Sequence, residues 1–112
     1  MHSIVQRLSI TTRARVDLQD ITPVVRGAVR SSGVESGICY LFVPHTTAGI
    51  MLNEHADPSV AQDITAQLER MVPQGGSYRH LEGNAPAHIK ASLVGNSETL
   101  LVEGGQVMLG RW

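Results

Sequence analysis

The run "GICYLFVP" at residues 37–44 is the feature that most limits how this chain can fold. Every residue between Gly37 and Pro44 is apolar, and the proline ends the run. A short apolar run bounded in this way is typical of a strand that is buried on both faces. We therefore expect a strand here, with other elements packed against both of its faces.

Four further strands are indicated by other stretches. Residues 12–18 alternate between apolar and charged side chains, and this period of two predicts a half-buried strand. Residues 4–10 resemble a preceding strand with a less regular pattern. The final stretch, "ETLLVEGGQVMLGRW", reads as two strands around a turn at Gly104 and Gly105.

Helical spacing appears in three places. After "DITP", Thr22 can cap a helix, Pro23 suits its first position and Gly33 is a plausible stop. A longer helix is expected to start with Asp57 as cap and Pro58 inside it. Its apolar stripe consists of Val60, Ile64, Leu68 and Met71. A short third helix is expected to open near Pro86 and end at Gly95, with Ile89 and Leu93 facing inward.

These elements predict an α+β fold in which residues 1–112 form a single domain with an antiparallel-rich sheet and two to three helices. Hydrophobic residues make up 42% of the chain and charged residues 17%, which excludes the composition of disordered chains. The net charge of −1, without a basic block, argues against nucleic acid or an anionic membrane as partner. With Cys39 as its one cysteine and no signal peptide pattern at the start, we expect a cytoplasmic protein.

Polar residues that can bind ligands collect in three stretches, each at the end of an expected element. These are "PHTTAG" (44–49), "NEHADP" (53–58) and "YRHLEGNAPAHI" (78–89). Loops held by a rigid scaffold are where binding groups usually lie. The candidate side chains are His45 and Thr46 in the first stretch, Asn53, Glu54 and Asp57 in the second, and His80, Glu82, Asn84 and His88 in the third.

Metal binding is the sharpest hypothesis for these residues. A catalytic zinc ion takes three protein ligands and leaves a position for water or substrate, and His45, His80 and His88 could supply them. Glu82 or Glu54 could act as a base, and these carboxylates or that of Asp57 could orient an imidazole. If the third helix opens near Pro86, His88 lies in its first turn, where the helix dipole disfavours the imidazolium form.

Each of these residues also has a purely structural interpretation. His2 and His55 are read as ordinary histidines at a terminus and in a loop. Asp57 could do no more than cap its helix, and Asn53 and Glu54 could satisfy loop backbone groups. Thr46 and Thr47 could be simple strand-end residues.

Three segments together resemble the YjbQ-type family, also called secondary thiamine-phosphate synthases. They are "VPHTTAGIMLNEHADPSVAQD", "YRHLEGNAPAHIKASLVG" and "GGQVMLGRW", and the likeness runs from residue 20 to residue 112. The resemblance implies small α+β subunits that form a homotrimer, with a polar pocket near the subunit interface. The family's residues match His45, His80 and His88, the pair Asn53–Glu54, Asp57–Pro58 and Gly83–Asn84.

The resemblance also implies an activity. Weak thiamine-phosphate synthase activity is associated with the family; it joins a pyrimidine diphosphate to a thiazole phosphate and releases pyrophosphate. A divalent metal ion, with zinc as the first expectation, would neutralise charge on such a phosphorylated metabolite. Thr46, Asn84 and helix N-termini could hold phosphate oxygens.

One departure from the family pattern concerns the end of the chain. Family members continue past the position of Trp112 with a further strand and an acidic stretch that this sequence lacks. We therefore expect an open sheet edge and a poorly covered Trp112.

Two functions remain open on the sequence alone. The first is an enzyme that acts on a phosphorylated small molecule, with histidines on the metal and Glu54 or Glu82 moving protons. The second is a binding protein that uses the same pocket without turnover. A structural role of the polar loops at a subunit interface is a third possibility.

Overall fold

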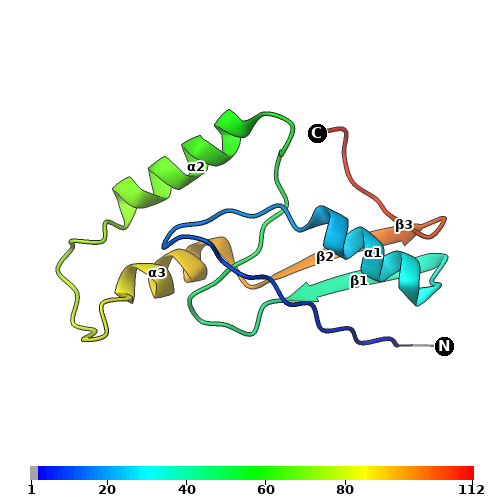
Figure 1. Cartoon of the computed structure of the whole chain (residues 1–112), viewed down its shortest axis with the longest axis horizontal. Coiled ribbons are helices and arrows are strands. Elements are labelled where there is room, and N and C mark those ends of the chain that lie inside the picture. Colours follow the sequence, from blue (N-terminus) through cyan, green and yellow to red (C-terminus); the bar gives the residue numbers. More distant parts are fainter. Residues whose placement is uncertain (1–2) are drawn as a thin grey trace. The chain divides into compact units, whose positions relative to one another are not determined.

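The structure is a computed structural model that describes residues 3–112 of the chain. These residues form three helices and a three-stranded sheet in the order β1-β2-β3, in which β1 and β2 run in opposite directions (Figure 1). The predicted α+β class with an antiparallel sheet is confirmed. No helix in the described part of the chain has the length and apolar character needed to span a bilayer. The elements are α1 (Thr22–Ser32), β1 (Ser36–Phe42), α2 (Pro58–Met71), α3 (Ala85–Val94), β2 (Ser97–Glu103) and β3 (Gln106–Val107).

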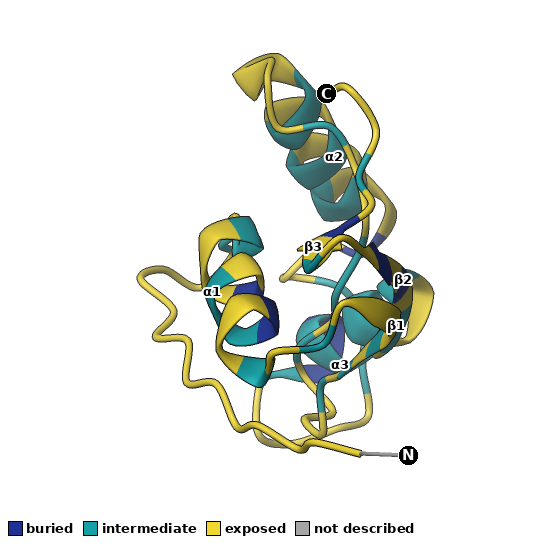
Figure 2. Ribbon diagram, turned by 90° about the vertical axis from the view of Figure 1, so that its right-hand side faces the viewer, coloured by how far each residue is buried: buried dark blue, intermediate teal, exposed yellow. Residues whose placement is uncertain are grey.

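The chain divides into two compact units. The first unit combines the chain up to Cys39 with Leu100–Arg111, and the second consists of Tyr40–Thr99 together with Trp112. In the first unit α1 packs against β3, and Figure 2 shows buried residues along one side of α1. The buried apolar side chains of this unit are Val25, Val29, Leu100, Val102 and Val107.

The hairpin between β2 and β3 follows directly from its two glycines. Gly104 and Gly105 both have positive φ angles, 60° and 74°. A two-residue turn of the kind that joins twisted antiparallel strands requires a positive φ at both positions, and only glycine adopts it freely. The two strands around this turn are confirmed, and their register pairs Glu103 with Gln106 and Val102 with Val107.

The start of α1 differs from its prediction by one residue. Thr22 is the first helical residue instead of the cap, and the carboxylate of Asp20 accepts hydrogen bonds from the Thr22 backbone N–H (3.0 Å) and hydroxyl (2.6 Å). Asp20 therefore takes the acceptor role expected of Thr22. The predicted end is confirmed, because the helix stops at Ser32 and Gly33 follows in a left-handed conformation.

In the second unit α2 begins where the sequence indicates. The Asp57 side chain accepts a hydrogen bond from the Ser59 backbone N–H at 2.9 Å, so the predicted cap is confirmed. The apolar stripe of α2 is only half covered: none of the described residues of this helix is buried, and Met71 is exposed. Lys90 of α3 forms an ion pair with Glu69, which joins α3 to α2.

The two strands predicted for residues 4–10 and 12–18 are wrong. Residues 3–21 contain no strand, and Figure 2 shows most of this segment as exposed. The Asp17 carboxylate instead accepts hydrogen bonds from the Gln19 side chain (2.6 Å) and the Arg13 backbone N–H (2.9 Å). Both bonds lower the pKa of Asp17 below its ordinary value of 3.8, and the bond from the Gln19 side chain has the larger effect. A local polar bend thus replaces the strand pairing that the alternating pattern indicates.

Two predictions about buried faces are also wrong. The strand β1 is not covered on both faces, since Ile38, Tyr40 and Phe42 are exposed by 68%, 64% and 58%. In α3 the residues expected to face inward, Ile89 and Leu93, are both exposed. An apolar run shows which side chains could be buried, but the presence of a second layer depends on contacts far away in the chain.

Candidate functional site

The segment between α2 and α3 is held by hydrogen bonds from side chains to backbone carbonyls. The Tyr78 hydroxyl donates to the Pro73 carbonyl at 2.5 Å. The Gln74 side-chain amide donates to the Gly83 carbonyl at 2.9 Å. These two bonds close residues 73–83 into a loop that carries polar side chains to the first turn of α3.

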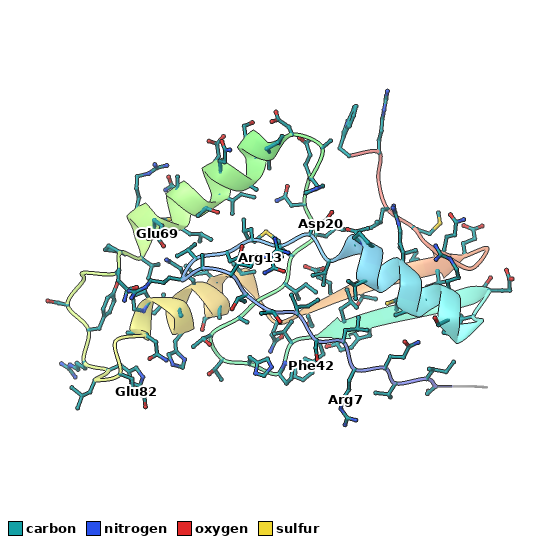
Figure 3. All side chains as sticks on the ribbon, in the orientation of Figure 1. Arg7, Arg13, Asp20, Phe42, Glu69 and Glu82 are labelled. Carbon is teal, nitrogen blue, oxygen red and sulfur yellow. The ribbon has the colours of Figure 1, made fainter. Side chains whose placement is uncertain are left out.

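This loop brings together three of the side chains singled out in the sequence. The ring centroids of His80 and His88 lie 5.3 Å apart, with the rings nearly perpendicular at 87°. The Nε2 atom of His80 is 3.8 Å from Oε2 of Glu82, a residue that Figure 3 shows in the loop before α3. We refer to these three residues as the His80–Glu82–His88 cluster.

Two of the three side chains of the cluster are exposed to solvent, and the third lies in a helix. The side chains of His80 and Glu82 are exposed by 43% and 75%, whereas His88 is half-buried. His88 lies in the first turn of α3, as predicted, because the helix begins at Ala85. Two imidazoles and a carboxylate can accept or donate protons. The three side chains are not placed to hold one metal ion together.

Asn84 adds a buried acceptor beside the cluster. Its backbone carbonyl accepts hydrogen bonds from the N–H groups of Ala87 (3.1 Å) and His88 (3.3 Å). Its side-chain Oδ1 is buried and has no hydrogen-bond partner among the described residues. A buried acceptor without a partner costs about 1–3 kcal/mol. A ligand that donates a hydrogen bond to this oxygen would recover that free energy.

Arg79 is a site residue that the sequence reasoning missed. It directly precedes His80, its side chain is exposed, and no ion pair ties it to an acidic group among residues 3–112. The available signal was the dipeptide "RH", a permanent cation beside an imidazole. A guanidinium at this position can bind phosphate with two hydrogen bonds.

The loop of His45 is held at the other end of α3. The Val43 N–H donates to the Asn96 carbonyl at 2.8 Å, and the Ile50 N–H donates to the Gly95 carbonyl at 3.0 Å. Both acceptors follow the last turn of α3, a helix of 10 residues. Such a helix is about 15 Å long, and the histidine pair lies at its first turn. His45, Thr46 and Thr47 are exposed on this distant loop.

The three-histidine site expected from the sequence is therefore not assembled in the part of the chain that the structure describes. Within residues 3–112 there is no group of three or more His, Cys, Asp or Glu side chains placed to hold a metal ion. The structure brings His80 and His88 together, and the anchors of the His45 loop lie at the opposite helix end. Metal binding stays a prediction.

In the acidic stretch at residues 53–57, the side chains of Asn53 and Asp57 accept hydrogen bonds from backbone N–H groups. Asn53 accepts a hydrogen bond from the Glu54 N–H at 2.7 Å. Hydrogen bonds from the backbone and then the side chain of Ser59 hold the pKa of Asp57 below its ordinary value of 3.8. These bonds confirm the predicted helix cap of Asp57 and the predicted contact of Asn53 with loop backbone. A binding role of either residue stays a prediction. Glu54, the remaining candidate of this stretch, is half-buried.

Comparison with known sequences gives consistent matches across the chain. A family model described as "UPF0047 protein YjbQ-like" matches residues 6–112. A UPF0047 protein of Methanocaldococcus jannaschii is 48% identical over 106 residues, which cover 95% of this chain and 77% of that protein. The UPF0047 protein YugU of Bacillus subtilis is 40% identical over 110 residues, or 97% of this chain and 83% of its own length.

Solved structures show the same fold. A protein of the YjbQ/UPF0047 family from Clostridium acetobutylicum has a TM-score of 0.81 at 51% identity, covering 84% of this chain and 73% of that chain. A YbjQ-like protein of unknown function from Sulfolobus solfataricus has a TM-score of 0.86 at 33% identity, covering 92% of this chain and 75% of that chain.

Proposed function

Because this chain belongs to the UPF0047 family of YjbQ-like proteins, we propose that it binds and transforms a phosphorylated small molecule at the His80–Glu82–His88 cluster. The observation that supports this proposal is the proximity of the three side chains, with 5.3 Å between the imidazole centroids and 3.8 Å between His80 and Glu82. Proton-transferring and anion-binding groups at a loop beside a helix start suit such a ligand.

The residues around the cluster have separate tasks in this proposal. Arg79 attracts the anionic phosphate oxygens, and in the metal-free protein a protonated imidazole adds to this attraction. The buried Oδ1 of Asn84 accepts a hydrogen bond from a hydroxyl or amine elsewhere on the ligand. Glu82 exchanges protons with the ligand directly or through His80, which lies beside it.

A divalent metal ion, with zinc as the first candidate, is the proposed cofactor. His80 and His88 would supply two imidazole ligands, the nitrogen donors that zinc accepts. The described residues provide no group of three ligands, so any further ligands would come from water, the substrate or another residue. The ion would neutralise charge on the phosphate.

Assembly is the proposed source of the remaining groups. We propose a homotrimer, in which Thr46 and His45 of one copy approach the cluster of another, while Asn53, Glu54 and Asp57 shape the neighbouring wall. The anchoring of the His45 loop away from the cluster supports a contribution between copies. Glu54, half-buried and without a hydrogen-bonded side chain in the described residues, would be the second proton-transferring group.

The finer form of the proposal is weak thiamine-phosphate synthase activity. A pyrimidine diphosphate and a thiazole phosphate are both polyanions, and pyrophosphate is the leaving group. Arg79 and the imidazoles would hold the anionic groups, and Asn84 would orient a neutral donor group of either substrate.

Calorimetric titration of pyrophosphate into the protein tests the binding step. We expect His88→Ala to weaken the affinity about tenfold or more, because one charge-assisted hydrogen bond contributes roughly 1.5–3 kcal/mol. His55→Ala is the matched control, since it removes an exposed imidazole from another loop of the same unit. Equal affinities of both variants and the parent protein would contradict the proposed site.

An assay for pyrophosphate release from the two thiamine precursors tests turnover. Product formation that is lost in Glu82→Gln but retained in Asp63→Asn would support the enzyme. Saturable binding without product over a long incubation would instead favour the binding protein that uses the same pocket.

A further inference from the structure

The first unit contains a cleft that shares no residue with the His80–Glu82–His88 cluster. Its volume is about 620 Å³, within the range of roughly 300–1,000 Å³ found for small-molecule sites. One wall is α1 from Arg26 onward, with Arg26 and Arg30, and the other is the β2–β3 hairpin with Gly104 and Gln106. Glu35, in the turn after α1, also lines it.

The two arginines form a pair of free cations. They are four residues apart on α1, so they lie on the same face of the helix. Both are exposed, and neither guanidinium makes an ion pair with an acidic group among residues 3–112. Against the single carboxylate of Glu35 the charged groups of the cleft sum to 2 − 1 = +1. Guanidinium groups bind phosphate in a bidentate manner, so the pair can hold a dianion.

The walls of the cleft are fixed by the backbone. The Gly105 N–H donates to the Glu35 carbonyl at 3.0 Å and ties the hairpin to the turn after α1. The Gly104 N–H has no hydrogen-bond partner among the described residues, which leaves one backbone donor for a ligand. The last carbonyls of α1 carry partial negative charge and, like Glu35, oppose an anion. Two arginines are therefore needed to make the cleft attractive to phosphate.

We propose that this cleft binds a hydroxylated phosphate monoester, such as a sugar phosphate. The phosphate contacts Arg26 and Arg30, and ligand hydroxyls donate to the Glu35 carboxylate and the Gln106 amide oxygen. A carboxylate inside a phosphate site is useful only if the ligand carries hydrogen-bond donors, and the hydroxyl groups of a sugar phosphate supply several besides any on the phosphate itself. This site is independent of the function proposed for the histidine cluster.

Nuclear magnetic resonance titration of ¹⁵N-labelled protein with ribose 5-phosphate tests the site. We expect the amide signals of Gly33, Gly104 and Gln106 to shift together with one dissociation constant. Arg30→Gln should raise that constant about tenfold. Arg7→Gln, which removes the same charge from the N-terminal segment (Figure 3), should leave it unchanged.

Four outcomes would overturn the proposal. Shifts confined to residues 79–88 would assign the sugar phosphate to the histidine cluster alone. Equal weakening by Arg30→Gln and Arg7→Gln would reduce the effect to overall charge. Inorganic phosphate binding as tightly as ribose 5-phosphate, or ribose binding as tightly as its phosphate, would remove the roles assigned to Glu35 or to the arginine pair.

Discussion

Two regions of the molecule are held in place by different kinds of contact. The first is α1 with the β2–β3 hairpin, and the second is the loop at residues 73–83, before α3. In the first, buried valines such as Val29 and Val107 lock two elements together. In the second, Tyr78 and Gln74 hold residues 73–83 through hydrogen bonds to carbonyls, and Leu81 in this loop is 97% exposed. Apolar burial gives a structure its most stable parts, whereas exposed polar loops open at low cost and can adapt to ligands.

In this chain of 112 residues, the side chains that stabilise the fold and the side chains that could bind a ligand therefore lie in different regions. The packed region buries no polar or charged residue. The loop region holds two imidazoles, a carboxylate and a guanidinium within residues 79–88. Substitutions in the first region should change the free energy of unfolding, and substitutions in the second should change ligand binding.

The largest expected effect comes from Leu100→Ala in β2. Leu100 is only 7% exposed, and removing a buried leucine side chain costs about 2–5 kcal/mol. Leu101→Ala is the control, because the neighbouring side chain is 60% exposed. Urea unfolding measures both; similar losses in the two variants would show that the packed core is not where the structure places it.

A smaller effect is expected from Gly49→Ala in the His45 loop. An added Cβ would lie 2.8 Å from the Gly95 carbonyl oxygen and 2.9 Å from Cγ1 of Val94. Relieving these contacts costs about 1–3 kcal/mol and should pull the loop away from the end of α3. Gly75→Ala serves as control, because a Cβ added there would meet nothing within 4 Å. Chemical denaturation that leaves Gly49→Ala unchanged would mean that this loop does not lie against α3.

The smallest effect concerns the Asp57 cap and depends on pH. Because hydrogen bonds from Ser59 depress the pKa of Asp57 below 3.8, its ionised form stabilises the fold above that pH. This contribution is lost as the pH falls through the lowered pKa. Asp57→Ala should therefore reduce the urea midpoint at pH 7 more than at pH 2.5. A pH-independent difference for Asp57→Ala would contradict a role for the charged cap.

Local rules were enough to predict much of this fold. Capping and turn residues such as Asp57, Gly33 and the pair Gly104–Gly105 act over a few positions, and their predicted roles are confirmed. The prediction of a strand at residues 12–18 was wrong because an alternating pattern does not show whether a partner strand is present. The segment instead forms local hydrogen bonds to the Asp17 carboxylate.

The candidate site, like the fold, was predictable where its residues are close to one another in the sequence. His80 and His88 are close in sequence, the first in the loop before α3 and the second in its first turn, so the segment "YRHLEGNAPAHI" already indicates their proximity. The position of His45 depends on hydrogen bonds to Gly95 and Asn96, about fifty residues further along the chain. No spacing rule connects such distant segments, and the sequence could not show that His45 stands apart.

The central claim is that His80 and His88 form the ligand-binding pair of this chain. The most direct test is to titrate Zn²⁺ into the protein and follow the ring nitrogen signals of its histidines by nuclear magnetic resonance. We predict that the signals of His80 and His88 change together at the lowest zinc concentrations, while that of His55 stays constant. Changes at His55 or His45 without any response from His80 and His88 would contradict the claim.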